Sequence, residues 1–203
     1  MSELEKVITE GGDERIELKE NGLNKYFVDP RTSKGHLNRG SCTCSALSVD
    51  VRTKVSTVYN HLITNEVSVE DIRIKQRFRI KALLQDSYTD DFNIFFAPSG
   101  SDLCYFPLMF SQIKNPNKPI LSLITCPEEL GTGSILANTG KFFSDKTQIE
   151  KSVNKGAPLK ADLHVDSILF PARNEDGSII DHKQAIYDAI DEHRDTHQII
   201  VNL

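Results

Sequence analysis

Apolar residues in the first part of the chain recur at helical spacing and predict two helices. One is expected over residues 48–62, where apolar side chains return every three or four positions. A second is expected to begin after Ser68, because Asp71 three residues on makes a short version of the capping box, and to run to about Leu84. The side chains that this second helix is expected to bury are Ile72, Phe78, Ile80, Ala82 and Leu83.

From residue 92 onward, continuous apolar runs alternate with helical patterns. This alternation is typical of a strand-and-helix domain. The predicted strands are residues 92–97, 120–126, 165–170 and 198–203. The predicted helices are residues 102–113, residues 135–139, and a helix capped by Asp181 with Ala185, Ile186, Ala189 and Ile190 on its apolar face.

Buried strands that alternate with helices indicate a mostly parallel sheet that is covered on both faces. We therefore expect an α/β fold, a three-layer sandwich with a mainly parallel sheet. We assign this α/β portion to residues 46–203, and an N-terminal segment and loop to residues 1–45, because residues 21–45 are rich in Gly, Asn, Ser and Pro. Ligands of such sheets bind at the carboxyl ends of the strands, so the loops after residues 97 and 126 are the candidate binding loops.

The turn Pro98-Ser99-Gly100-Ser101-Asp102 has the features of a phosphate site. The first N–H groups of a helix lack intrahelical partners and the dipole is positive there, so anions bind at a helix start. Gly100 lets the backbone approach a ligand closely, and the hydroxyls of Ser99 and Ser101 add donors. The alternative is an ordinary turn in which Ser101 or Asp102 caps the helix.

Composition narrows the class of protein. Hydrophobic residues make up 38% and charged residues 26% of the 203 residues, as in a folded globular protein. The net charge of −5 and the scattered basic residues indicate no nucleic-acid partner. No stretch is long enough to cross a membrane and no signal-peptide core is found, so we expect a cytoplasmic protein. Cys42 and Cys44 have the wrong spacing for a zinc knuckle, and no metal site is predicted.

Two short motifs follow one another along the chain. They read FFAPSGSD and ITCPEELGTGSILANTGKFFS, and a strand, a helix and a strand come after them. Residues 36–203 thereby resemble the large domain of pyridoxal-phosphate enzymes of the aspartate-aminotransferase type (fold type I), and within that group the class V-like members. The resemblance implies a transferase or lyase that acts on an amino acid with pyridoxal phosphate as its cofactor. Since such enzymes build their active sites between two subunits, it also implies a homodimer or a complementary chain.

The resemblance also implies which residues bind the cofactor. Ser99, Gly100 and Ser101 would hold the cofactor phosphate at the start of the helix. Glu129 and Thr132 would border the cofactor ring or the substrate. The alternative for Glu129 and the glutamate before it is an acidic pair that the dipole of a helix start stabilises.

The chain departs from the family at the catalytic lysine. Such enzymes need a lysine to form the Schiff base and a carboxylate to keep the pyridine nitrogen protonated. In the family both lie beyond the strand that matches residues 198–203. Lys141 and Lys183 do not fall at that position, so the catalytic residues stay unknown, and we expect them in a further region or a second polypeptide.

Two other functions stay open on the sequence. The chain is alternatively a truncated, non-catalytic binding or regulatory partner that keeps the phosphate-binding turn. A third hypothesis is a small enzyme that acts on a phosphate substrate, with Glu128, Glu129 or a histidine as the acid or base.

Overall fold

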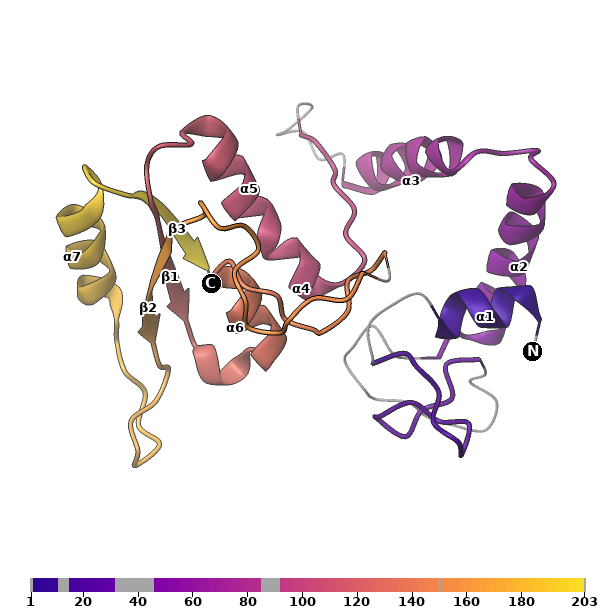
Figure 1. Ribbon diagram of the computed structural model, residues 1–203, viewed down its shortest axis with the longest axis horizontal. Coiled ribbons are helices and arrows are strands. Elements are labelled where there is room, and N and C mark those ends of the chain that lie inside the picture. The colour runs from indigo at the N-terminus through magenta and orange to yellow at the C-terminus, as the bar shows by residue number, and fades with distance from the viewer. Residues whose placement is uncertain (1, 11–14, 32–45, 85–91, 150, 203) are drawn as a thin grey trace. The chain divides into compact units, whose positions relative to one another are not determined.

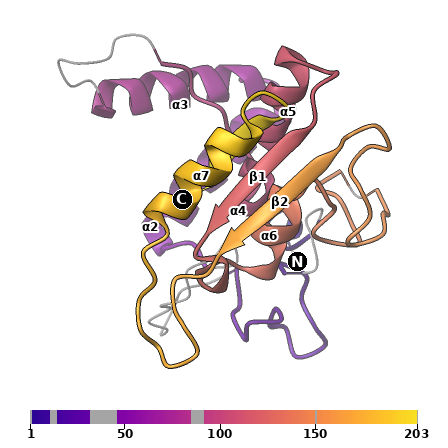
Figure 2. The ribbon, with the colours of Figure 1, turned by 90° about the vertical axis from the view of Figure 1, so that its left-hand side faces the viewer.

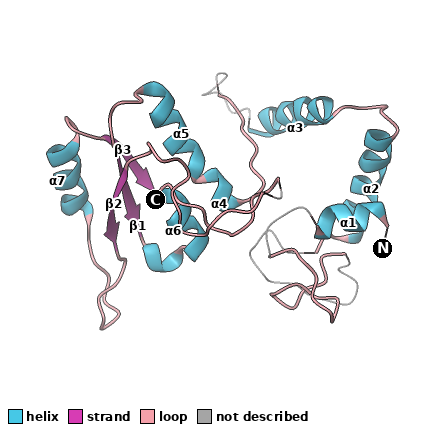
Figure 3. Ribbon diagram, viewed as in Figure 1, coloured by secondary structure: helices cyan, strands magenta, loops and turns pink. Residues whose placement is uncertain are grey.

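The computed structural model describes residues 2–10, 15–31, 46–84, 92–149 and 151–202 (Figure 1). The chain divides into two compact units, Met1–Phe96 and Ala97–Leu203. The first unit contains the helices α1 (Glu3–Thr9), α2 (Val49–Ile63) and α3 (Val69–Leu84). Among the described residues, all the strands belong to the second unit (Figure 3).

Two helices of the first unit, α2 and α3, begin where the sequence predicts. At the start of α2, the Ser48 hydroxyl accepts a hydrogen bond from the Val51 N–H at 3.3 Å. At the start of α3, the Asp71 N–H donates to Ser68 Oγ at 3.0 Å and the Ser68 N–H donates to Asp71 Oδ2 at 2.9 Å. This reciprocal pair satisfies two backbone donors that a helix start otherwise leaves without partners, which confirms the predicted capping box.

The predicted burial along α3 is wrong for its largest side chain. Phe78 is 74% exposed and Leu83 is 85% exposed. Ala82 is also exposed, and only Ile72 and Ile80 are half-buried. The physical reason is helical geometry: at 3.6 residues per turn, the six positions between Ile72 and Phe78 place them about 120° apart around the axis. The apolar residues of α3 therefore do not form one stripe.

Residues 92–97, predicted as a strand, form none in the structure. Residues 92–96 instead contact side chains of α3. Arg77 Nε donates to the Ile94 carbonyl at 3.3 Å, and its guanidinium lies 5.9 Å from the centre of the Phe96 ring. The Lys81 ammonium lies 5.3 Å from the Phe92 ring centre. An apolar run becomes a strand only where a neighbouring strand takes its backbone groups, and here cationic side chains of a helix pack on its rings instead.

The second unit is built on a parallel sheet with the strand order β2-β1-β3. Its strands are β1 (Ile120–Thr125), β2 (Val165–Phe170) and β3 (Gln198–Asn202). In register, Ile120 lies opposite Val165 on one side and Gln198 on the other. This confirms the predicted α/β class, the parallel sheet and three of the four predicted strands.

Helices lie on both faces of this sheet. Leu121 and Leu123 of β1 point to α7 (Lys183–His193), where they form a buried cluster with Phe170 and Ala189. The helices α5 (Tyr105–Lys114) and α6 (Thr132–Asn138) lie on the opposite face (Figures 1 and 2). Alternate residues of a strand point to opposite faces, so the complete burial of β1 requires helices on both sides.

The predicted helix over residues 102–113 is two helices in the structure. These are α4 (Gly100–Leu103) and α5, with Cys104 between them. Pro107 explains the break: it has no N–H to give to the Leu103 carbonyl, and its ring would clash with that carbonyl in a continuous helix. The next helix, α6, begins at Thr132, three positions before the predicted start at residue 135.

At the end of β1, the backbone adopts a conformation that is rare for its residue type. Cys126 has φ 50° and ψ 49°, in the left-handed region, although it is not a glycine. Its N–H donates to the Phe170 carbonyl at 2.9 Å, and the short 3₁₀ helix η1 (Pro127–Glu129) follows. The chain after β1 goes to α6 and the chain after β2 goes to α7, on opposite faces. In open α/β sheets, ligands bind where the chains leave two neighbouring strands in such opposite directions.

The strain at Cys126 predicts an inverted order of stability among three variants. Gly usually destabilises by about 0.5–1 kcal/mol relative to Ala, but a left-handed conformation costs an L-residue about 1–2 kcal/mol. We therefore expect Cys126→Gly to be as stable as Cys126→Ala or more stable. Cys126→Val should be the least stable, because a β-branched residue is a genuine outlier at positive φ. Denaturant unfolding measures the three free energies, and Ala more stable than Gly would contradict the strain.

Candidate functional site

The predicted phosphate turn lies at the start of α4, and Ser99 is its cap. The Ser99 hydroxyl donates to Asp102 Oδ2 at 2.6 Å and accepts from the Asp102 N–H at 3.3 Å. The alternative in which Ser101 or Asp102 caps the helix is therefore wrong in its choice of residue. The side chain of Ser99 is committed to the helix start, and it is only 6% exposed.

Ser101 meets the second sequence motif at the start of α6. Its hydroxyl lies 3.5 Å from the hydroxyl of Ser134, and Ser101 is 7% exposed. Gly133 makes this approach possible, because a Cβ at that position would lie 3.3 Å from Ser101 Oγ and 3.6 Å from Phe143. Two polar turns that are separated by about thirty residues are thus packed closely against each other, and a methyl group at Gly133 would make a tight contact.

Gly100 has open space beside it. A Cβ at this position would meet no protein atom within 4 Å, and the backbone is not left-handed. The backbone conformation of the turn therefore does not require a glycine at position 100. Of the first N–H groups of α4, those of Asp102 and Leu103 already donate to the Ser99 hydroxyl and the Ser99 carbonyl.

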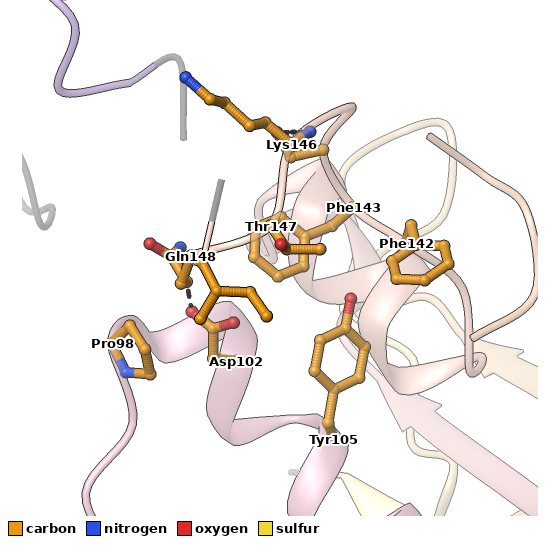
Figure 4. A pocket seen from close by; sticks show the side chains of 10 residues that line it. Pro98, Asp102, Tyr105, Phe142, Phe143, Lys146, Thr147 and Gln148 are labelled. Carbon is orange, nitrogen blue, oxygen red and sulfur yellow. Dashed lines mark hydrogen bonds between the residues drawn. The ribbon is translucent and has the colours of Figure 1, made fainter. Parts of the chain in front are cut away.

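A cavity of about 270 Å³ lies beside the turn (Figure 4). The Tyr105 and Phe143 rings form one wall, stacked with their centres 5.8 Å apart and their planes inclined by 25°. Asp102 lies at the edge, where Gln148 Nε2 donates to its Oδ2 at 3.4 Å. The lining residues are Pro98, Asp102, Tyr105, Phe142, Phe143, Ser144, Lys146, Thr147, Gln148 and Ile149. This wall of flat rings next to a polar turn suits a planar ligand that carries an anionic group.

Tyr105 lines the cavity, and the pKa of its phenol is shifted. Burial raises the pKa of its phenol from 10.0 to about 12, against the opposing effect of a hydrogen bond to Phe143 and with small contributions from Asp102 and Cys104. The hydroxyl donates to the Lys141 carbonyl at 3.0 Å. Tyr105 is therefore a neutral, fixed ring at neutral pH and not a proton-transfer group.

The structure places the other two predicted binding residues at the surface. Glu129 and Thr132 are both exposed. The neighbouring Glu128 accepts hydrogen bonds from the backbone N–H groups of Ala172 and Arg173. Both glutamates of the acidic pair are thus exposed, and Glu128 is the one that is bonded to the loop after β2.

The sequence analysis did not single out Ser134, Tyr105 or Phe143. Ser134 lies in the middle of the second motif, and Tyr105 follows Ser101 by four positions, which places it one turn further on in a helical pattern. The second motif also contains Phe143. The helical spacing was the available signal for Tyr105, but only the fold shows that Phe143 stacks on it.

Candidate lysines and metal ligands lie elsewhere or are absent from the described part. Lys141 and Lys183 are exposed. Lys146 lines the cavity, but its side chain extends away from the rings (Figure 4). Within the described ranges, no group of three or more His, Cys, Asp or Glu residues has the arrangement of a metal site. Cys42 and Cys44 lie outside the described residues.

Comparisons with known proteins found no relative of this chain. No protein-family model matches the chain, and neither a curated protein nor a solved structure matches it. In the part of the chain that the structure describes, none of the helices has the length and apolarity needed to span a membrane.

The raised pKa of Tyr105 predicts a late step in an alkaline titration. We expect one phenol to ionise only near pH 12 in the folded protein, and Tyr105→Phe to remove that step from the ultraviolet titration. Because the folded-state pKa exceeds the ordinary value, the stability that this phenol contributes is complete below about pH 10 and is lost as the pH rises through about 12. An unchanged titration curve in the variant would contradict this assignment.

Proposed function

We propose that the chain is part of a pyridoxal-phosphate-dependent transferase or lyase that acts on an amino acid. In this proposal the chain contributes the phosphate-binding turn and part of the substrate pocket. The fold would be the three-layer sandwich of the fold type I large domain, and the assembly a homodimer or a complex with a complementary chain. The observation that carries the proposal is the meeting of the two sequence motifs, Ser101 against Ser134, beside an aromatic cavity.

The residues present fit a flat aromatic phosphate. A phosphate would take the N–H groups of Gly100 and Ser101, next to the buried Ser101 hydroxyl, and a Cβ-sized space is open at Gly100. The stacked Tyr105 and Phe143 rings offer an apolar surface to a planar ring. Asp102 is the charge that would oppose an anion, but its carboxylate already accepts hydrogen bonds from Ser99 and Gln148.

Each residue then has a binding or shielding role. The turn at Ser99–Ser101 would hold the phosphate, and the rings of Tyr105 and Phe143 would exclude water from one side of the pocket. Glu129 and Thr132, exposed on the neighbouring turn, would border the substrate. Bound pyridoxal phosphate supplies an electron sink for cleavage at the amino-acid α-carbon. Sheet ligands bind at the carboxyl ends of strands, and the 127–134 segment lies there.

The proposal assigns the lysine that attaches the cofactor to a second polypeptide or a further region. Among the described lining residues Lys146 is the single lysine, and it extends away from the rings (Figure 4). The pocket that these residues form is therefore a binding surface. The nucleophile is expected to come from the complementary part of the assembly.

A pair of variants at Gly100 tests phosphate binding by charge alone. Gly100→Asp and Gly100→Asn have nearly the same shape, and the new side chain enters open space in both. The aspartate would repel a bound phosphate, so we expect its Kd for pyridoxal phosphate to rise at least about tenfold above that of the asparagine variant. Equilibrium dialysis measures both constants. Equal constants, or no binding by the unaltered protein, would overturn the proposal.

Borohydride trapping locates the lysine. The assembly purified from its native source is reduced in the presence of pyridoxal phosphate, and the labelled peptide is mapped. We expect one dominant adduct on a companion chain or on sequence other than residues 1–203. A dominant adduct on Lys146 would place the whole reaction within this chain, and scattered or absent labelling would favour the non-catalytic partner.

A further inference from the structure

Glu128 ties the turn after β1 to the turn after β2. Its Oε1 accepts from the Ala172 N–H at 2.5 Å and from the Arg173 N–H at 3.2 Å. These two donors are consecutive backbone groups of the segment that leaves β2, whereas Glu128 belongs to η1. Hydrogen bonds to an ionised acceptor are stronger than neutral ones. One side chain thus bridges the carboxyl ends of two neighbouring strands.

Backbone bonds at Cys126 hold the start of the same turn. The Cys126 N–H donates to the Phe170 carbonyl, and the Cys126 carbonyl accepts from the Glu129 N–H, both at 2.9 Å. A left-handed residue that is not glycine persists only where its surroundings determine its conformation. The contacts of Cys126 and Glu128 together set the direction in which η1 leaves the sheet.

The turn that follows η1 packs against Ser101, so the direction of η1 affects the surroundings of Ser101. The chain from η1 passes through Gly131 into α6, and its first turn brings Gly133 and Ser134 against the Ser101 hydroxyl. The hypothetical Cβ at Gly133 would already lie 3.3 Å from Ser101 Oγ. A small shift of the α6 start would therefore press on Ser101 or separate the two hydroxyls. Close-packed interiors transmit such displacements.

We infer that Glu128 is a positioning residue for the candidate site. It holds the turn of residues 131–134 in place against Ser101 through its two hydrogen bonds to the turn after β2. The effect on cofactor binding rests on the proposed function, whereas the effect on the turn does not. Glu128 acts through the backbone and has no contact with a reacting group in this role.

The neighbouring glutamate provides a matched control. Glu128→Ala and Glu129→Ala remove the same side chain from adjacent positions and change the net charge equally. Only the first removes the hydrogen bonds to Ala172 and Arg173. Glu128→Gln is the rescue variant, since an amide oxygen accepts two hydrogen bonds and restores the acceptor without the charge.

Amide hydrogen exchange of the full chain tests the inference without any ligand. In Glu128→Ala we expect the amides of Ala172 and Arg173 to exchange about tenfold faster, and those of Ser134 and Ile135, whose N–H groups donate to the Gly131 carbonyl, to exchange faster as well. Glu129→Ala and Glu128→Gln should remain close to the unaltered protein. Faster exchange confined to residues 172–173, or the same pattern in both alanine variants, would overturn the inference.

Pyridoxal-phosphate binding is then measured on Glu128→Ala and Glu128→Gln, since Glu129 itself borders the substrate in the proposed function. We expect Glu128→Ala to raise the Kd about tenfold and to change the induced circular dichroism of the bound cofactor, with recovery in Glu128→Gln. A Kd and spectrum unaffected in Glu128→Ala would overturn the positioning role. If the unaltered protein binds no pyridoxal phosphate, the proposed function fails, and the exchange experiment alone decides the role of Glu128.

Discussion

The complete burial of β1 is the constraint on which the second unit depends. Ile120, Leu121, Leu123 and Ile124 are each no more than 2% exposed, and each such side chain contributes about 1.5–3 kcal/mol when buried. Burial on both faces requires helices on both sides and a strand on each edge. The parallel pairing places Leu121 and Leu123 on one face of the sheet and Ile120 and Ile124 on the other. Asn202 reinforces it by donating to Ser122 Oγ at 2.9 Å.

The burial of β1 at the centre of the sheet also determines where a functional site can form in the second unit. With β1 at the centre, its carboxyl end lies next to that of β2, and the chain must leave the two strands in opposite directions. The strained Cys126 and the Glu128 bridge both occur there, and the turn that follows delivers Ser134 to Ser101. The polar turn at α4 is thus not an isolated helix start. Its buried serine depends on a second segment that the sheet holds in place.

The sequence predicted those elements whose signal is local or continuous. The strands at 120–125 and 165–170 are short segments rich in Ile, Leu, Val and Phe, and the start of α3 carries its own capping residues, so neighbours in the sequence suffice to indicate them. The prediction failed where the deciding partner is distant. Residues 92–97 have the composition of a strand, but α3 side chains pack on them instead. The interruption at Cys104 was predictable in principle, because Pro107 removes a backbone donor.

At the candidate site, the sequence could not distinguish the roles of residues of the same type that lie close together in the chain. Glu128 and Glu129 are chemically identical, and both fit an acidic pair at a helix start. Only the position of β2 shows that the first one accepts two backbone N–H groups while the second faces solvent. The same holds for the serines: Ser99 and Ser101 are equivalent in the sequence, but the fold commits Ser99 to the cap and turns Ser101 toward Ser134.

Binding and catalysis are physically separable in this arrangement. In the proposed function, the turn at Gly100, the buried Ser101 hydroxyl and the aromatic wall would complement a planar phosphate, and none of them supplies the amine nucleophile that attaches the cofactor. Tyr105 does not supply one either, because burial keeps its phenol neutral far above neutral pH. An enzyme and a non-catalytic partner would therefore share every described feature of this pocket. The difference between them is whether a lysine from elsewhere reaches the ring, and the turn held by Glu128 would serve both.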